Sequence, residues 1–247
     1  MLGIIGGTGL TQLSNLEVTR RQVVRTPFGD PSGALTFGKL NRRDVVFLAR
    51  HGYGHTIAPH EVNYRANIWA LHAEGAGQIV SVASVGGIRA DLVPGALAIP
   101  HQVLDYTQGR KHTFFEGPDQ PVTHVDFTHP YCEELRARLL TAAAAAGQVI
   151  VNNGVYAATQ GPRLESAAEI DRLERDGADM VGMTGMPEAA LARELGLRYA
   201  VVAVVVNHAA GRGDSSEAIH LDQINVVLQA SMVKVRSLLE KLVESGD

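Results

Sequence analysis

Glycines cluster directly after the first apolar run of the chain, in the loop Gly6 to Leu10. Such a loop lets backbone N–H groups approach an anion, and the hydroxyl of Thr8 adds a donor, although a plain tight turn explains the same residues equally well. A dinucleotide site needs G-x-G-x-x-G and an acidic residue about 20 positions further on. Here the third glycine is missing, and Arg25 stands where that acid would. The loop therefore favours a small-anion site over a nicotinamide site.

The charge balance and the lone cysteine narrow the class of protein. With 22 Lys and Arg against 26 Asp and Glu, the formal net charge is -4, whereas a nucleic-acid partner requires a basic surface. Cys132 cannot form an internal disulfide, which fits a reducing compartment, and its neighbours offer no cationic activation for a nucleophilic thiolate. The histidines lack metal-ligand spacing of the HExxH kind. We therefore expect no nucleic-acid partner and no metal.

No apolar stretch is long enough to predict a membrane span. The longest, Tyr199 to Val206, falls far short of the roughly 20 residues required. The first apolar run also lacks the basic flank of a signal peptide. Both observations predict a cytoplasmic protein with no membrane partner.

Apolar runs alternate with helical patterns along most of the chain. This alternation predicts an α/β fold: a single domain, residues 1–247, with a mixed, partly parallel central sheet flanked by helices. The expected strands are 2–5, 34–39, 45–49, 78–85, 96–106, 149–158, 180–183 and 199–206. The expected helices are 63–74, 133–146, 166–176, 187–195 and 221–243, the third opened by a capping box of Ser166 and Glu169. The Gly- and Pro-rich loop 107–128 is longer than a passive connection usually is, which predicts a functional or interface role.

Four sequence blocks in a fixed order carry a family resemblance. They are Arg50-His51-Gly52 with His55, Pro59 and 62–71; 82–87 with Arg89 and Pro94-Gly95; 160–163; and 177–179 through Met183-Thr184 to Pro187-Glu188. Together with the glycine loop, these blocks resemble the methylthioadenosine phosphorylase branch of the trimeric purine nucleoside phosphorylases, from Gly3 to about Leu239. The resemblance implies an enzyme that cleaves the purine–sugar bond with inorganic phosphate as co-substrate and no other cofactor. It also implies a homotrimer with pockets at subunit interfaces.

The resemblance further implies which residues contact phosphate and nucleoside. Phosphate would be held by Thr8, Arg50, His51, the backbone of Ala83 and Ser84, and Thr184. This fits their chemistry, because guanidinium, hydroxyl and backbone N–H groups all donate to oxyanions. Alanine at position 83 replaces the family's usual threonine, which leaves open whether Ser84 supplies the missing hydroxyl. The nucleoside pocket would include Val85, Gly86, Leu164 and Met183, with Met183 against the ribose.

Two positions predict which purine is cleaved. Asn207 stands where adenosine-type members of the family have aspartate, and Glu165 stands where methylthioadenosine enzymes have serine. A carboxylate accepts a hydrogen bond from the N1–H of hypoxanthine, and a carboxamide donates to O6 or N7. Adenine reverses this pattern, and sites of this kind can discriminate by roughly 10⁴-fold. The pair predicts a 6-oxopurine; a strand-end cap and a helix N-terminal charge are the alternative explanations of the two residues.

The sugar end of the predicted pocket is apolar. Leu221 stands where ordinary inosine enzymes have a histidine, or Ile219 and His220 do if the register slips. An apolar wall of Leu221 and Ile224 favours a methylthio group over a hydroxyl. His124 resembles the histidine that methylthioadenosine enzymes lend to a neighbouring subunit's pocket. Together with the purine-reading pair, these features predict S-methyl-5'-thioinosine as the substrate.

The expected mechanism needs no protein nucleophile. Bound phosphate would attack C1′ as the purine departs through an oxocarbenium-like state. Asn207 would stabilise the negative charge that builds on the purine, while Arg50, His51 and Thr184 orient the nucleophile. A methylthioadenosine phosphorylase with unusual pocket residues and an inosine/guanosine phosphorylase are alternative interpretations. A non-catalytic nucleoside-binding protein and, more distantly, a dinucleotide oxidoreductase are alternatives of other classes.

Overall fold

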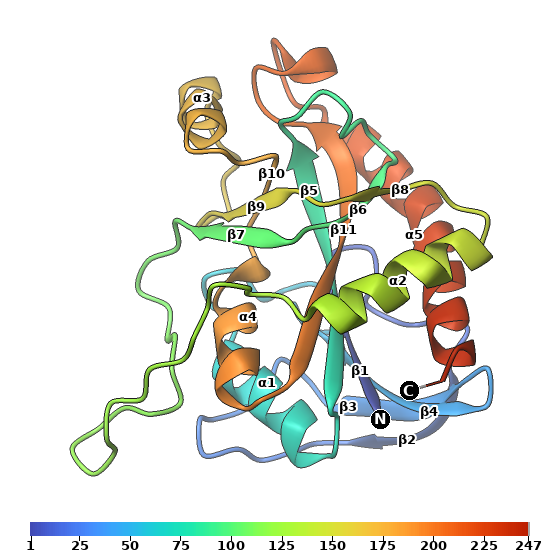
Figure 1. Ribbon diagram of the computed structural model, residues 1–247, viewed down its shortest axis with the longest axis vertical. Helices are drawn as coiled ribbons and strands as arrows, with labels where there is room; N and C mark the ends of the chain where they lie inside the picture. Colours follow the sequence, from blue (N-terminus) through green and yellow to red (C-terminus); the bar gives the residue numbers. More distant parts are fainter. Residues whose placement is uncertain (247) are drawn as a thin grey trace.

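The sheet is built around strand β5 (Gln78–Gly87) in the computed structural model, which describes residues 1–246. Strands β1 (Leu2–Gly6) and β11 (Arg198–His208) run parallel to β5, one along each of its edges (Figure 1). Almost all residues of these three strands are buried, as expected for apolar strands covered on both faces. Their carboxyl ends therefore point the same way and can contribute to one site.

The other strands extend this sheet and make it mixed. Beside β1 lie, in order, β4 (Arg43–Ala49), parallel to β1, and the antiparallel strands β3 (Leu35–Leu40) and β2 (Glu17–Gln22). At the carboxyl end of β5, pairing continues through β10 (Met180–Gly182), β9 (Val155–Ala158) and β7 (Gln102–Asp105). Beside β11 lie β6 (Leu97–Ile99) and β8 (Ile150–Asn152). The prediction of a mixed, partly parallel sheet is confirmed.

Helices cover both faces of the sheet. They are α1 (Tyr64–Ala73), α2 (Glu133–Ala145), α3 (Ala167–Arg175), α4 (Gly185–Glu194) and α5 (Leu221–Glu244), with a 3-10 turn, η1 (Gly213–Ser215). Val201 and Val205 of β11 belong to one core, which contains buried residues of α1 and α4. Val202 and Val204 belong to the other, which contains buried residues of α2 and α5. The two-residue period of a strand thus explains why every residue in this run is apolar.

A few element boundaries differ from those predicted. Strand β2 is missing from the predicted set because all its residues except Val18 are polar and most are exposed, so that pairing with β3 alone makes it a strand. The segment 149–158 is broken at Asn153 and Gly154, whose φ angles of 74° and 155° leave the β region. Helix α4 is kinked at Met186, which has extended φ and ψ because a proline follows it.

The long loop 107–128 has no regular secondary structure and projects from the body of the molecule (Figure 1, lower left). Its residues 116–126 are all exposed, whereas Arg110 and Phe114 near its start are buried. The loop is therefore anchored at its beginning and exposed along its tip. Within residues 1–246, no helix combines the length and the apolarity needed to cross a lipid bilayer.

Candidate functional site

A cavity of about 480 Å³ opens where several strands end. Its walls come from the loops after β1, β4 and β10 and from the carboxyl-terminal parts of β5 and β11. Most residues predicted to contact phosphate or nucleoside line it, namely Thr8, Arg50, His51, Ser84, Val85, Gly86, Leu164, Glu165, Met183, Thr184, Asn207 and Leu221. The structure therefore gathers residues from the whole chain around one cavity, while their individual roles stay predictions.

Ala83 and His124 are the predicted site residues that do not line the cavity. The Ala83 side chain is 2% exposed and packs in the core, and its neighbour Ser84 points the other way because side chains alternate along a strand. The Ser84 hydroxyl oxygen is buried without a hydrogen-bond partner among residues 1–246. That state is unfavourable, and a bound oxyanion or water molecule would relieve it. His124 lies on the exposed tip of loop 107–128.

Arg50 is held by a buried carboxylate that the sequence reasoning did not single out. Its side chain is 1% exposed, and its Nε and Nη2 donate to the two carboxylate oxygens of Glu188, which is 0% exposed. Nη2 also donates to Ser81 Oγ, and Nη1 donates to the Val82 carbonyl at 3.1 Å. Burial opposes the charge on Arg50, but Glu188 more than offsets burial and raises the pKa of the guanidinium. Among residues 1–246, Arg50 thus has one Nη1 hydrogen left for the cavity rather than a fork of donors.

His51 lines the same cavity and is a neutral hydrogen-bond acceptor there. Its Nδ1 lies 2.8 Å from the Ile57 carbonyl oxygen, and because a carbonyl only accepts, Nδ1 carries the ring proton. Burial, together with the charge of Arg50, lowers the pKa of His51 to about 4. At neutral pH the Nε2 atom therefore bears a lone pair. A ligand oxygen that contacts Nε2 must therefore bring its own hydrogen.

The glycine loop after β1 packs directly against Arg50. A Cβ atom built on Gly7 would lie 2.6 Å from the Val82 carbonyl oxygen and 2.8 Å from Arg50 Nη1. Only glycine therefore allows this close approach. The next residue, Thr8, has its hydroxyl 3.0 Å from His55 Nε2. The loop and the arginine together form one polar wall of the cavity.

Glu165 and Asn207 each keep hydrogen-bonding capacity for a ligand. Glu165 Oε1 accepts from Thr159 Oγ1 at 2.6 Å, which leaves Oε2 unpartnered among residues 1–246. Asn207 Nδ2 donates to the His208 carbonyl at 2.6 Å, which leaves Oδ1 and one Nδ2 hydrogen. A β-bulge between Val205 and Asn207 redirects the strand at this point. The cavity thus contains a carboxylate acceptor and an amide that both accepts and donates.

The apolar part of the wall comes from the start of α5 and the residues before it. Ile219, Leu221 and Ile224 line the cavity, whereas His220, the N-cap residue of α5, does not. Leu221 and Ile219, which represent the two registers considered from the sequence, thus both contribute apolar surface to the cavity. Leu221 is 64% exposed, so this end of the cavity is open to solvent in the single chain.

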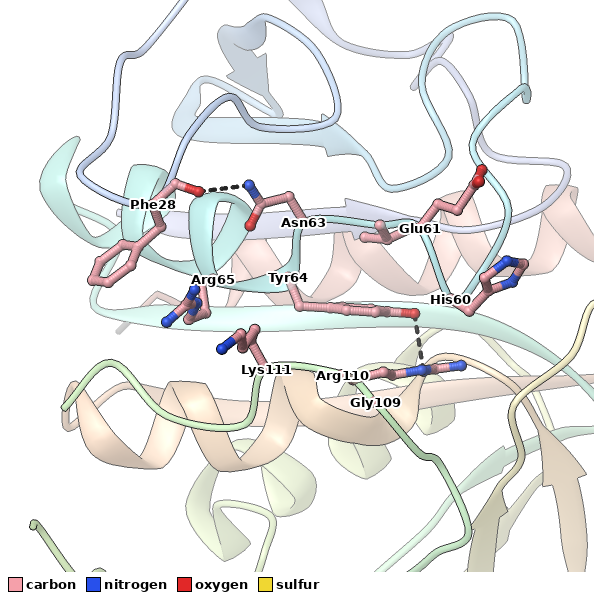
Figure 2. A pocket seen from close by; sticks show the side chains of 10 residues that line it. Phe28, His60, Glu61, Asn63, Tyr64, Arg65, Gly109, Arg110 and Lys111 are labelled. Atoms are coloured by element: carbon pink, nitrogen blue, oxygen red, sulfur yellow. Dashed lines mark hydrogen bonds between the residues drawn. The ribbon is translucent and has the colours of Figure 1, made fainter. Parts of the chain in front are cut away.

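A second pocket, of about 320 Å³, is lined in part by Arg110 from loop 107–128 (Figure 2). Arg110 is 9% exposed and donates to the Tyr64 hydroxyl at 3.1 Å, as the dashed line in Figure 2 shows. Its other acceptors are the carbonyls of Met183 and Met186 at 2.7 Å each, Gln160 at 2.9 Å and Thr159 at 3.2 Å. One guanidinium thus ties the long loop to the segments that carry Met183 and Glu165.

Sequence reasoning missed Glu188, Arg110 and Thr159 as residues that shape the site. A signal for Glu188 was available, because an acidic residue inside an apolar helix such as α4 indicates a buried partner. Thr159 is the polar residue that follows the buried strand β9, which is a weaker signal. Arg110 stands in an irregular loop, where no periodicity marks it.

The chemistry of the cavity follows from these side chains. One charged N–H, hydroxyls and a histidine acceptor can hold a protonated oxyanion, and Glu165 and Asn207 can hold a heterocycle that presents both a donor and an acceptor. The apolar residues near Leu221 suit a ligand end that does not hydrogen-bond. Among residues 1–246, no three or more His, Cys, Asp or Glu side chains gather as a metal site would require.

Comparison with known proteins places these features in a family. A family profile described as the phosphorylase superfamily matches residues 1–244. The probable S-methyl-5'-thioinosine phosphorylase of Pseudomonas syringae pv. tomato is 53% identical over 243 residues, 98% of each chain. The 6-oxopurine nucleoside phosphorylase of Pyrococcus furiosus is 46% identical over 215 residues, 85% of this chain and 80% of the relative.

Solved structures agree with this assignment. Methylthioadenosine phosphorylase from Schistosoma mansoni in complex with adenine superposes with a TM-score of 0.94 at 33% identity, covering 100% of this chain and 92% of that one. The same organism's enzyme in complex with tubercidin superposes with a TM-score of 0.92 at 33% identity, again covering 100% and 92%. The family profile covers nearly the whole sequence, the relatives are highly similar in sequence, and the solved structures share the fold. The chain therefore belongs to the phosphorylase superfamily.

Proposed function

We propose that this protein catalyses the phosphorolysis of S-methyl-5'-thioinosine to hypoxanthine and 5-methylthioribose 1-phosphate. The observation that carries the proposal is one cavity in which the acceptor Glu165 Oε2 and the amide of Asn207 occur together with the apolar residues near Leu221. The curated relative from Pseudomonas syringae carries the name of this activity and is similar along almost the whole chain.

The purine is recognised by its hydrogen-bond pattern. Hypoxanthine donates from N1–H, which Glu165 Oε2 accepts, and its O6 and N7 accept from the free Nδ2 hydrogen of Asn207. Adenine presents a lone pair at N1, so a carboxylate facing it would lose a bond and repel it. The relative from Pyrococcus furiosus, named a 6-oxopurine nucleoside phosphorylase, supports this part of the proposal.

The 5′ group is recognised by the absence of polar partners. Ile219, Leu221 and Ile224 offer a thioether methyl an apolar surface and give a 5′-hydroxyl no hydrogen bond. This preference separates the proposed substrate from inosine. An inosine or guanosine phosphorylase is the second candidate, because the purine-reading pair is the same in both cases.

Phosphate is the nucleophile and the only co-substrate. The Nη1 hydrogen of Arg50 and the hydroxyls of Thr8, Ser84 and Thr184 would surround it, and His51 would accept a hydrogen from one of its oxygens. A second phosphate oxygen attacks C1′ while the bond from C1′ to the purine breaks. The electron pair of that bond moves into the purine, where the Asn207 amide stabilises it.

The remaining features of the proposal concern assembly and location. The projecting loop 107–128, with His124 at its exposed tip, would complete the cavity of a neighbouring subunit in a homotrimer. The open end of the cavity at Leu221 leaves room for such a contribution. Residues 1–247 would act as one domain, since a single sheet connects the site segments. The expected location of this domain is the cytoplasm.

The test compares three nucleosides at fixed phosphate concentration. Purine release would be measured from methylthioinosine, inosine and methylthioadenosine, each with and without phosphate. We expect kcat/KM to be highest for methylthioinosine, and turnover should require phosphate. A preference for methylthioadenosine would overturn the purine assignment, a preference for inosine would overturn the 5′ assignment, and tight binding without turnover would indicate a nucleoside-binding protein.

A further inference from the structure

Thr159 stands beside the carboxylate that is proposed to read the purine. It follows strand β9, and its hydroxyl oxygen lies 2.6 Å from Glu165 Oε1 and 3.2 Å from the Gly182 carbonyl oxygen. Both distances are within hydrogen-bond range, but the contact to Glu165 is markedly shorter. The single hydroxyl hydrogen is therefore donated to Glu165, and the Gly182 carbonyl is the more distant acceptor.

The position of this hydroxyl is set by the sheet. The Thr159 backbone N–H donates to the Gly182 carbonyl at 2.8 Å, which continues the pairing of β9 with β10. Its carbonyl accepts from Arg110 Nη2 at 3.2 Å. Glu165, by contrast, lies in the loop before α3 between two exposed residues, Leu164 and Ser166. The rigid partner in this pair is the threonine, so it orients the carboxylate rather than the reverse.

From this geometry we infer that Thr159 is a positioning residue that keeps Glu165 Oε2 a hydrogen-bond acceptor toward the ligand. The inference rests on the proposed role of Glu165 in purine recognition. Thr159 donates to Oε1, which holds the carboxylate in place and leaves Oε2 to accept from a ligand. An acceptor at this position suits the N1–H of a 6-oxopurine.

The consequence concerns discrimination against adenine. A carboxylate oxygen held toward N1 has no hydrogen to offer the N1 lone pair of adenine, so a fixed Oε2 disfavours a 6-aminopurine. The hydrogen bond from Thr159 to Oε1 keeps Oε2 in that position. Removing the hydroxyl frees Glu165 to rotate, so that Oε2 no longer stays directed toward N1. Discrimination between the two purines should therefore depend on an atom that need not touch the ligand.

The experiment compares Thr159→Val, which removes the hydroxyl at nearly constant volume, with Thr159→Ser, which retains it. The readout is the ratio of kcat/KM for methylthioinosine to that for methylthioadenosine. We expect Thr159→Val to lower this ratio about tenfold, the usual effect of losing one hydrogen bond to a charged group, and Thr159→Ser to restore most of it. Thr159→Val in a Glu165→Gln background should leave the ratio nearly unchanged, because the effect acts through Glu165.

The outcomes separate this inference from the proposed function. If Thr159→Val lowers both kcat/KM values equally, or leaves the ratio at the wild-type value, Thr159 has a structural role only and the inference is wrong. If wild-type protein itself prefers methylthioadenosine, the proposed function fails before any variant is considered. Thermal unfolding of each variant reports whether it folds. Thr159→Ala provides a second hydroxyl-free variant, read by the same ratio, should the valine side chain disturb packing.

Discussion

Glu188 accepts hydrogen bonds from Arg50 at both of its carboxylate oxygens, and neither side chain is more than 1% exposed. Ser81 Oγ and the Tyr199 hydroxyl, each 2.8 Å from Glu188 Oε2, complete the partners of this carboxylate. The guanidinium of Arg50 is therefore held by Glu188, and its remaining Nη1 hydrogen is available to the cavity. A residue proposed to orient phosphate thus owes its geometry to a helix residue that lies 138 positions further along the chain.

Replacing Glu188 by glutamine should destabilise the protein and weaken phosphate binding together. Breaking one partner of a buried ion pair leaves an uncompensated charge, which costs about 3–5 kcal/mol of unfolding free energy. Urea denaturation measures the first effect, and the KM for phosphate measures the second. Glu116→Gln, which removes an exposed partner of Arg65, is the matched control and should change both quantities far less. Equal effects of the two substitutions would contradict the assigned role of Glu188.

His51 should make the site discriminate phosphate from sulfate. Its Nε2 lone pair accepts the hydrogen that a phosphate ion carries, whereas sulfate at neutral pH has no hydrogen to offer. We expect the inhibition constant of sulfate to exceed the KM for phosphate at least about tenfold, since an acceptor facing an oxyanion is left unpaired. His51→Asn, whose amide can donate, should narrow this gap. Sulfate that competes as well as phosphate binds would show that Nε2 is not an acceptor.

The same histidine makes stability depend on pH in a defined window. Burial and Arg50 lower the pKa of His51 to about 4 in the folded chain, while the unfolded chain takes up this proton near 6.5. Between these values the unfolded state binds more protons, so the contribution is intact above pH 6.5 and is lost as the pH falls. His51 alone can cost up to about 1.4 kcal/mol per pH unit there. Urea denaturation at pH 7 and pH 5 should show a smaller loss for His51→Asn than for wild type, and an identical loss would disprove this assignment.

Asn207→Asp should shift the purine preference. The carboxylate removes the Nδ2 hydrogen proposed to donate to O6 or N7 and offers an acceptor to the N6 amino group of adenine. Loss of one donor to the developing charge typically lowers kcat by about 10²–10³-fold, and that loss should fall mainly on methylthioinosine. Steady-state kinetics with methylthioinosine and methylthioadenosine give both values. An unchanged preference would remove Asn207 from purine recognition.

The sheet and the cavity could be predicted because their signals lie within single segments of the sequence. The run Tyr199 to Val206 is apolar at every position, which is typical of a strand covered on both faces, and the structure buries all of it. Residues such as Thr8 and Asn207 follow or end such strands. Because parallel strands end on the same side of a sheet, their side chains meet in one cavity.

What the sequence did not predict depends on neighbours distant along the chain. Five of the six residues of β2 are polar, and only their partner β3 makes this segment a strand. The importance of Glu188 comes from Arg50, and that of Thr159 from a 2.6 Å contact with a loop residue. The donors that Arg50 can offer phosphate are few because Glu188, Ser81 and Val82 accept most of its hydrogens. A pattern within one segment can indicate that Glu188 is buried with a partner, but it does not identify the partner.

The most direct test of purine recognition is a crystal structure with hypoxanthine and phosphate bound. Glu165 Oε2 should lie about 3 Å from N1, with Thr159 Oγ1 still on Oε1 and the Asn207 amide within the same distance of O6 or N7. A heterocycle bound with both side chains turned away from it would contradict the substrate assignment, whatever the fold.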